Sequence, residues 1–324
     1  MTRSRLAVLA ALTGALALGP ASGAVARSDA AIAEPSATIV AAPRVALTAL
    51  GLMATARHSI DLEMYELGNP GIVAGLEAAR RRGVLVRVVS DPTETQSKAS
   101  DAQLERAGIA VRTLAVRGGI DHVKLLVVDH ARVLVGGVNF GRGSSATVDG
   151  DVVLSGAGGR AATSVFNRDW AAAGGAGMAA NGTYGPFVTG SAILPAMLSI
   201  IGHATTSCTI VANYLSDDSI QHALVAARRR GVAVTAVLNP TGYGEASAAA
   251  WLEKGRVHVE IAPTRPYLHA KILACGPEAM IGSANFSYDA MTVNHELDVV
   301  LDGRAGLMVG DFALGVARAD QSPQ

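Results

Sequence analysis

The sequence HVKLLVVD, residues 122–129, returns in altered form as HAKILACG, residues 269–276. In each copy a His-x-Lys pair opens an apolar run of the kind that forms a buried strand. Side chains two residues apart on a strand project from the same face, so each histidine should lie beside its own lysine. The pairs are His122 with Lys124 and His269 with Lys271. The two copies therefore predict one kind of polar site that the chain builds twice.

Each copy is followed at a matching distance by a Gly-x-x-Asn-Phe turn and then by a carboxylate. The turns run from Gly136 to Asn139 and from Gly282 to Asn285. The carboxylates are Asp149 and Glu296, and both lie 27 residues after their histidine. A shared spacing of this length indicates a duplicated unit.

Strand and helix patterns around the two copies also repeat, with an offset that stays near 147 residues. The strands are expected at 60–65, 84–89, 209–214 and 232–238, and the helices at 70–82 and 219–230. Strands that alternate with helices of this length indicate an α/β fold. We expect two pseudo-symmetric repeats, each a mixed, mostly parallel sheet flanked by helices, with the active site at the interface of the repeats.

The 324 residues suffice for two modest domains or one large duplicated domain. The first 26 residues combine a basic start, an apolar run too short to span a bilayer comfortably and small residues at their end. We therefore expect a secreted or periplasmic protein, with an uncleaved membrane tether as the alternative. The expected divisions are a signal peptide at 1–26, a leader at 27–43, the first repeat at 44–178, a linker at 179–191 and the second repeat at 192–324.

Charge is sparse and balanced, with 27 basic and 27 acidic residues. Removal of residues 1–26, which hold Arg3 and Arg5, would leave 27 minus two, or 25, basic residues against 27 acidic ones. This balance disfavours a protein that holds a long nucleic acid. Two arginine triplets, at 80–82 and 228–230, stand just before a glycine, where they suit the C-terminal end of a helix.

The chain has two cysteines, Cys208 and Cys275. Each lies in an apolar, strand-like run, so the sequence leaves open whether they form one disulfide or two buried thiols. Two cysteines do not make a zinc framework, and no metal or cofactor is expected.

Lysine usage marks the two motifs, because the chain has 23 arginines but only four lysines, and two of the four follow a motif histidine. A lysine ammonium is a compact point charge with three donors. One histidine would attack the phosphorus of a phosphodiester and the other would protonate the departing oxygen, each oriented by a carboxylate. The groups that could hold the non-bridging oxygens are Lys124, Lys271, Asn139 and Asn285.

The first motif is complete, with Asp129 seven residues after the histidine, and it resembles the signature of the phospholipase D superfamily. The resemblance covers nearly the whole chain after residue 26. It implies a phosphohistidine intermediate, no metal, and two motifs that meet between the halves. It also implies that His122 attacks and that His269 serves as acid and base. By the same resemblance Glu296 orients His122, and Asp149 orients His269.

Two positions depart from that signature. Gly276 stands where the second motif would have its aspartate, and in the superfamily this aspartate supports the loop more than the chemistry. Gly137 stands where a serine or threonine is frequent, whereas the second repeat has Ser283. The sequence therefore predicts that one hydroxyl contact to phosphate is missing while activity is retained.

The leading interpretation is a phosphodiesterase of the phospholipase D type that hydrolyses phospholipid headgroup bonds, with transient contact to a membrane surface. An alcohol in place of water would make the same site a phosphatidyl transferase. A nuclease acting on DNA or RNA is disfavoured by the acidic balance and the low aromatic content. A catalytically degenerate binding protein is a further alternative. One chain holds both motifs, so a monomer suffices to build the site.

Two further polar residues adjoin site residues in the sequence. Asp121 precedes His122, and His295 precedes Glu296. Because alternate residues of a strand face opposite ways, we expect both side chains to point away from the site, and we assign them no role.

Overall fold

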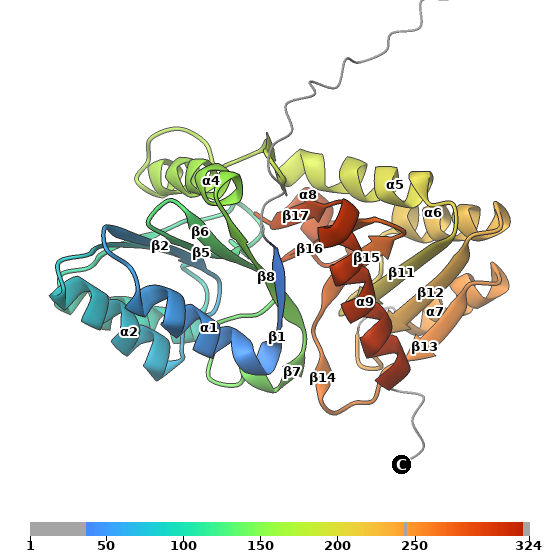
Figure 1. Ribbon diagram of the computed structural model, residues 1–324, viewed down its shortest axis with the longest axis horizontal. Coiled ribbons are helices and arrows are strands. Elements are labelled where there is room, and N and C mark those ends of the chain that lie inside the picture. Colours follow the sequence, from blue (N-terminus) through green and yellow to red (C-terminus); the bar gives the residue numbers. More distant parts are fainter. Residues whose placement is uncertain (1–36, 243–244, 320–324) are drawn as a thin grey trace, which may run out of the picture. The chain divides into compact units, whose positions relative to one another are not determined.

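The computed structural model describes residues 37–242 and 245–319, so the expected signal peptide lies outside the described residues. A seven-stranded sheet forms the first repeat, in the order β1-β8-β6-β5-β2-β3-β4 (Figure 1). Its strands are β1 (Thr38–Ala41), β2 (Ser59–Met64), β3 (Leu85–Ser90), β4 (Ala110–Thr113), β5 (Lys124–Val128), β6 (Arg132–Gly136) and β8 (Gly150–Ser155). One face carries α1 (Ala42–Ala54), α2 (Pro70–Arg81) and α3 (Thr95–Arg106), and the other carries α4 (Ala157–Ala173).

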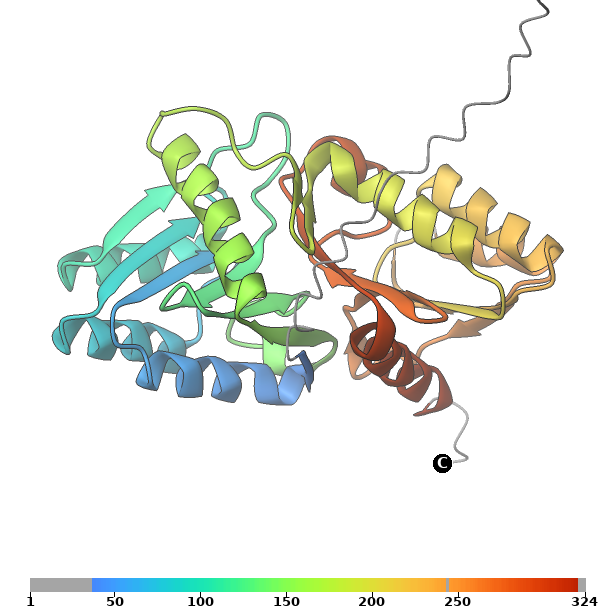
Figure 2. The same ribbon diagram turned by 45° about the horizontal axis from the view of Figure 1, so that its top comes forward.

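An eight-stranded sheet forms the second repeat, in the order β13-β12-β11-β15-β16-β17-β10-β9. Its strands are β9 (Gly182–Tyr184), β10 (Phe187–Thr189), β11 (Ser207–Ala212), β12 (Ala233–Leu238), β13 (His258–Ile261), β15 (Lys271–Cys275), β16 (Glu278–Gly282) and β17 (Leu297–Leu301). One face carries α5 (Ile193–His203), α6 (Asp218–Arg229) and α7 (Glu245–Lys254), and the other carries α9 (Gly303–Ala319) (Figure 2). Across residues 37–242 and 245–319, the helices are all too short or too polar to cross a membrane.

The expected pair of mixed sheets flanked by helices is confirmed, but the sheets are not mostly parallel. In the first sheet β2, β3 and β4 run parallel in two pairings, and the other four pairings are antiparallel. The second sheet has two parallel and five antiparallel pairings. The reason lies in the His-x-Lys strands, because β5 and β15 run antiparallel to β2 and β11 and return through short turns into β6 and β16.

The segments expected to lead and to link are parts of the sheets. From Thr38 onward the leader forms β1, which pairs with β8, and α1 already begins at Ala42. The linker at 179–191 contains β9 and β10, which extend the second sheet beyond β17. Their Ala- and Gly-rich composition lacks the alternation of a half-buried strand, yet edge pairing by backbone bonds does not require it.

The two repeats share a hydrophobic core. One cluster joins side chains from β5, β6 and β8 of the first sheet with side chains from β15, β16 and β17 of the second. Helices α4 and α9 contribute Phe166 and Val309 to this cluster. The outer faces have separate clusters, one under α1 to α3 and one under α5 to α7. The shared core fixes the positions of the two His-x-Lys strands relative to each other.

The two cysteines form a disulfide, which settles the alternative that the sequence left open. Cys208 on β11 and Cys275 on β15 are direct partners in the antiparallel register, and both are buried. Their sulfur atoms are bonded at 2.02 Å. The disulfide ties the start of β11 to the end of the second His-x-Lys strand.

Candidate active site

Each motif histidine lies just before a central strand, β5 or β15, next to the segment that carries the other repeat's carboxylate. The His122 N–H donates to the carbonyl of His295 (2.9 Å), and the His269 N–H donates to the carbonyl of Val148 (3.0 Å). His295 and Val148 each directly precede a site carboxylate. These crossed backbone bonds bring each imidazole to the acid of the other repeat.

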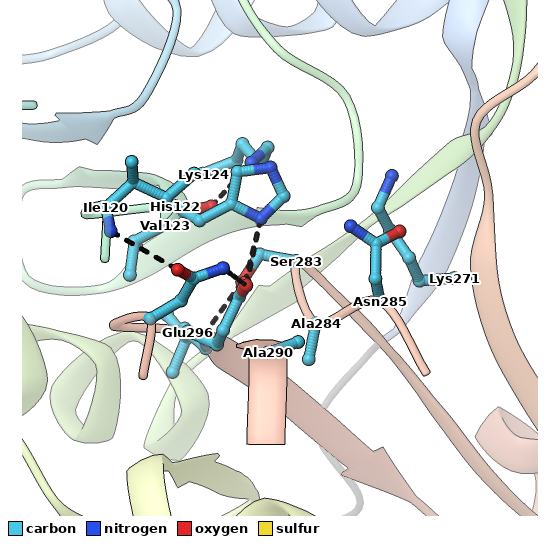
Figure 3. Close-up of polar contacts among 12 residues, drawn as sticks. Ile120, His122, Val123, Lys124, Lys271, Ser283, Ala284, Asn285, Ala290 and Glu296 are labelled. Carbon is cyan, nitrogen blue, oxygen red and sulfur yellow. Dashed lines mark hydrogen bonds and ion pairs between the residues drawn. The ribbon is translucent and has the colours of Figure 1, made fainter. Parts of the chain in front are cut away.

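In the first pair, the carboxylate of Glu296 faces the imidazole of His122 (Figure 3). Nδ1 of His122 lies 2.9 Å from Oε2 of Glu296. The same carboxylate accepts hydrogen bonds from the Ser283 hydroxyl (2.5 Å) and the Asn294 amide (3.2 Å). Burial alone would raise the pKa of Glu296, but His122, Lys124 and the Ser283 hydroxyl hold it below its ordinary value. The carboxylate therefore stays charged beside the ring.

In the second pair, Nδ1 of His269 lies 2.8 Å from Oδ2 of Asp149. The Gly150 N–H donates to the other carboxylate oxygen at 2.8 Å. Burial again opposes ionisation, but His269 and Lys271 lower the pKa of the Asp149 carboxyl. The structure thus contains both cross-repeat contacts that the resemblance implied, Glu296 with His122 and Asp149 with His269.

Gly137 and Ser283 occupy equivalent places under these two acids. Ser283 is fully buried, and its hydroxyl donates to the carboxylate of Glu296. At Gly137 a Cβ would lie 2.5 Å and 2.7 Å from the two carboxylate oxygens of Asp149. Gly137 therefore leaves space for the carboxylate of Asp149, whereas the Ser283 hydroxyl bonds to the longer side chain of Glu296.

Lys124 and Lys271 are almost completely buried. Each ammonium donates to the carbonyl of its own motif histidine, and Nζ of Lys271 also lies 3.1 Å from Nδ1 of His269. Burial lowers the pKa of Lys124 to about 7, with Glu296 opposing the shift, and it lowers the pKa of Lys271 to about 8, with Asp149 opposing. Each lysine also lowers the pKa of the histidine in the other repeat, so the two motifs form one electrostatic unit.

Both imidazoles favour the neutral form. Burial lowers the pKa of His122, although the Glu296 carboxylate opposes the shift. Burial and the charge of Lys271 lower the pKa of His269 to about 4. The side chains keep limited exposure, 9% for His122 and 19% for His269, so both rings are within reach of a ligand from solvent. A neutral imidazole whose Nδ1–H is held by a carboxylate leaves Nε2 with a free lone pair.

The two motif asparagines have different surroundings. Within the described part of the chain, the amide oxygen of Asn139 is buried without a hydrogen-bond partner. The amide oxygen of Asn285 accepts from the Asn213 amide at 3.2 Å, and Asn213 in turn accepts from the Tyr267 hydroxyl at 2.9 Å. Figure 3 draws Asn285 and Lys271 on the same side of the His122–Glu296 pair. The hydrogen bonds and charge interactions thus bring together both histidines, both lysines and both carboxylates.

Asp129 supports a loop, as the resemblance implied. Its carboxylate accepts hydrogen bonds from three consecutive backbone N–H groups, those of Arg57, His58 and Ser59, at 2.7–3.2 Å. Gly276 takes the equivalent turn at φ +60°, close to φ +52° at Asp129. In the second repeat the Cys208–Cys275 disulfide joins the two equivalent strands, β11 and β15. The missing aspartate is therefore a missing structural contact.

Two further buried acids lie near the site, and the sequence pattern above did not assign them a role. Asp151 accepts from the Val138 N–H (3.0 Å), and Asp298 accepts from the Ala284 N–H (3.1 Å), so each holds a Gly-x-x-Asn turn. Both are buried, and burial raises the pKa of Asp298 to about 8. Each stands two residues after a site carboxylate, with the same offset near 147 as the rest of the repeat.

Aromatic rings next to the histidines were also overlooked. The Tyr65 ring meets the His122 ring edge-on, with centroids 5.1 Å apart, and Nζ of Lys124 lies 5.3 Å from the Tyr65 centroid. Tyr65 follows β2 at the end that faces the site. Residues at the ends of parallel strands are expected to line a ligand site, and this rule would have pointed to it.

Asp121 and His295 point away from the site, as expected, but the assignment of no role to them is incomplete. They form a β-bridge with each other behind the His122–Glu296 pair. Nε2 of His295 lies 3.1 Å from Oδ1 of Asp169, on α4, and 3.9 Å from Oε1 of Glu63, on β2. All four residues are buried. Glu63, Asp169 and His295 are spaced so that they could hold a metal ion.

A family profile described as "Cardiolipin synthase, PLD-like domain" matches residues 50–170 and 197–310, which hold both motifs. Curated relatives named phospholipase D match a shorter stretch. The protein from Rickettsia bellii (strain RML369-C) is 37% identical over 87 residues, which cover 26% of this chain and 43% of the relative. That from Rickettsia felis (strain ATCC VR-1525 / URRWXCal2) is 35% identical over 86 residues, covering 26% and 42%. The match thus spans less than half the length of these relatives.

Solved structures share the fold over most of the described chain. Phosphatidylserine synthase from Haemophilus influenzae Rd KW20 has a TM-score of 0.68 at 12% identity, covering 88% of this chain and 86% of its own. Polyphosphate kinase from Porphyromonas gingivalis has a TM-score of 0.66 at 15% identity, covering 87% and 47%. At these identities the likeness shows the fold alone.

Proposed function

Because this chain belongs to the phospholipase D-like (PLD-like) domain family, we propose that it is a phosphodiesterase that hydrolyses phospholipid headgroup bonds. The observation that carries the proposal is the pair of imidazoles, each bonded through Nδ1 to a buried carboxylate of the other repeat. A nucleophile and an acid–base group on opposite sides of one phosphorus need this arrangement. The curated relatives named phospholipase D support the choice of a lipid substrate.

In the first step, Nε2 of His122 attacks phosphorus. The Nδ1–H group of the same ring stays hydrogen-bonded to the Glu296 carboxylate. The bond to the headgroup oxygen breaks, and a proton carried by Nε2 of His269 passes to that oxygen, so the headgroup alcohol leaves. The anionic diester itself supplies the field that favours protonated His269, whose pKa is low in the free protein. The product of this step is a phosphatidyl group bonded to Nε2 of His122.

In the second step, neutral His269 takes a proton from water as the water oxygen attacks phosphorus. The P–N bond breaks, its electron pair returns to Nε2 of His122, and phosphatidic acid is released. Lys124 and Lys271, whose ammonium groups are held on backbone carbonyls, offset the charge that builds on the non-bridging oxygens. An alcohol that enters in place of water would give a phosphatidyl transferase from the same residues.

A nuclease is the second candidate, and the distribution of cations counts against it. A cavity of about 420 Å³ is lined by Arg228, Arg229, Lys254, Gly255 and Arg256, at the C-terminal ends of α6 and α7. These ends lead into the starts of β12 and β13, whereas Asn239, just after the other end of β12, bonds to Asn213 near the site. This basic cluster therefore lies at the far ends of the strands from the site, where it cannot guide a nucleic-acid backbone to the histidines.

The disulfide supports the proposed export, because disulfides persist in oxidising compartments. We propose a secreted or periplasmic protein that contacts a membrane surface transiently. Both motifs lie in one chain, so a monomer is sufficient for the proposed reaction.

The deciding experiment compares headgroup release from phosphatidylcholine and phosphatidylglycerol vesicles with cleavage of single-stranded DNA. The wild-type protein should release headgroup, and mass spectrometry after a quench in denaturant at alkaline pH, where the P–N bond is stable, should find a phosphatidyl adduct on His122. His122→Asn should lose both signals, while His203→Asn, at an exposed histidine, should keep both. Cleavage of DNA without headgroup release would favour the nuclease, and the absence of both reactions would favour a binding protein.

A further inference from the structure

A buried polar cluster lies behind the His122–Glu296 pair, on the side away from the proposed reaction. Its members are Glu63 on β2, Asp169 on α4, Asp121 before β5 and His295 before β17. Their relative exposures are 0% for Glu63, Asp121 and Asp169 and 6% for His295. Three carboxyl groups and one imidazole thus share a space that bulk water does not reach.

The hydrogen bonds of the described residues leave much of this cluster without donors. Both carboxylate oxygens of Glu63, Oδ2 of Asp121 and Oδ2 of Asp169 are buried without a hydrogen-bond partner. The other oxygen of Asp169 accepts from the Ala180 N–H at 2.6 Å. Arg87, which extends over the same face of the sheet, is paired with Asp61 at 2.8 Å. Burial of unpaired carboxylate oxygens is costly, so they require a proton or a cation.

The repeat provides an internal comparison, because the equivalent positions of the other repeat are apolar or glycine. Val211 is the fifth residue of β11, as Glu63 is of β2, and Leu268 precedes His269 as Asp121 precedes His122. Val148 stands for His295, and Gly315, the thirteenth residue of α9, stands for Asp169 in α4. Val148, Leu268 and Gly315 line an apolar cavity of about 490 Å³. The fold therefore does not require polar groups at these positions.

The spacing of the cluster fits a small divalent cation. Bonds of about 2.0–2.1 Å to nitrogen and oxygen put neighbouring ligand atoms of a tetrahedral shell about 3.3 Å apart. Nε2 of His295 lies 3.1 Å from Asp169 and 3.9 Å from Glu63, and one ligand atom from each of these three residues lies within 4.8 Å of the others. Small shifts of two side chains would close the shell. Mixed imidazole and carboxylate ligands suit Zn²⁺ or Mn²⁺ better than Ca²⁺.

We infer that Glu63, Asp169 and His295 form a binding site for a divalent transition-metal cation. The inference does not depend on the proposed lipid substrate. Asp121 and His295 are bridged to each other, and each adjoins a member of the His122–Glu296 pair. A cation bound there links β2, α4 and the segment before β17. It thereby stabilises the position of the His122–Glu296 pair from the side away from the proposed reaction. It contacts no reacting atom.

Because the ligands are buried, the cation must enter as the chain folds, and the test uses refolding. The full chain, with its disulfide intact, is unfolded in guanidinium with a chelator, dialysed, and refolded with Zn²⁺, Mn²⁺, Ca²⁺ or no metal. After gel filtration, metal per chain is measured by mass spectrometry. We expect about one Zn²⁺ or Mn²⁺ per chain, retained through gel filtration, and a higher Tm than in the metal-free protein.

Glu63→Gln and His295→Gln remove one ligand each and should lower the bound metal at least tenfold and abolish the rise in Tm. Asp101→Asn is the matched control, because Asp101 is a buried acid of the same repeat that bonds to Ser90 outside the cluster. It should bind metal as the wild-type chain does. Circular dichroism checks that each variant is folded, and the His295 variant stands in if the Glu63 variant is not. If the refolded wild-type chain binds no metal, the cluster holds only protons and the inference is wrong. If the two variants bind as much metal as the wild-type chain, the metal lies elsewhere and the inference is also wrong.

Discussion

Nδ1 of His122 and Oε2 of Glu296 lie 2.9 Å apart although 174 residues separate them in the chain. The reciprocal contact joins His269 to Asp149 at 2.8 Å. Each imidazole is thus oriented by an acid from the other repeat, so neither repeat contains a complete histidine–carboxylate pair of its own.

Replacement of Glu296 by Gln should lower kcat for headgroup release by about 10³–10⁴-fold, because an amide no longer selects the His122 tautomer with its proton on Nδ1. The measurement is initial headgroup release from vesicles at saturating lipid. Glu278→Gln, at a partly exposed acid on β16 next to His203, is the control and should keep full activity. A Glu296→Gln protein with more than a tenth of wild-type kcat would refute the orienting role.

Gly137→Ser should impair the protein, even though it restores the residue type that the superfamily signature favours. A Cβ at position 137 would lie 2.5 Å from Oδ1 of Asp149 and push that carboxylate off His269. We expect kcat/KM to fall at least tenfold, equivalent to about 1.4 kcal/mol. Gly143→Ser is the matched control, because a Cβ there meets nothing within 4 Å. Equal activity of the two variants would show that Asp149 can move without loss.

The stability of the wild-type protein should fall in acid through His269. Its pKa is about 4 in the folded protein and 6.5 ordinarily, so between these values the unfolded chain binds the proton and the folded chain does not. The contribution is complete above pH 6.5 and is lost as the pH falls to 4, with an upper bound of about 3 kcal/mol. Urea unfolding of the wild-type protein and of His269→Gln, at several pH values from 4 to 7, isolates this residue. The free energy of unfolding of the wild-type protein relative to the variant should decrease steadily with acidification; a constant difference would contradict the shift.

Asp129→Ala should destabilise the fold without affecting the chemistry. The substitution removes the acceptor for three backbone N–H groups at the start of β2, although water can replace it because Arg57 and His58 are exposed. We expect a loss of about 1–2 kcal/mol in the free energy of unfolding and an unchanged kcat at 25 °C. Asp311→Ala, at an exposed acid of α9, should change neither. A large fall in kcat with unchanged stability would place Asp129 in the reaction.

The site residues that recur in both repeats could be predicted from the sequence. His122 and Lys124 recur 147 residues later and Asn139 recurs 146 residues later, and the alternation of strands and helices predicted a duplicated α/β fold. Strand direction could not be read, because a strand buried on both faces is apolar whether its neighbours are parallel or antiparallel. This is why β5 and β15 were expected in mostly parallel sheets.

The buried polar cluster, which does not recur in the repeat, could not be predicted from the sequence. Glu63, Asp121, Asp169 and His295 come from four separate segments, and each has an apolar or glycine equivalent in the other repeat. Alternation gave the correct direction for Asp121 and His295, away from the reaction, but not their neighbours. Only tertiary packing of α4 on β2 shows that these side chains meet.

The exchange of acids between the repeats also bears on how the protein arose. A single ancestral unit with this fold could not have oriented its own histidine, whereas two identical copies related by a two-fold axis would have supplied each other's acid. The present chain holds in one polypeptide the two acids that such copies would exchange. Two units in one polypeptide can differ in sequence. They do so at Gly137 and Ser283, at Asp129 and Gly276, and at Glu63 and Val211.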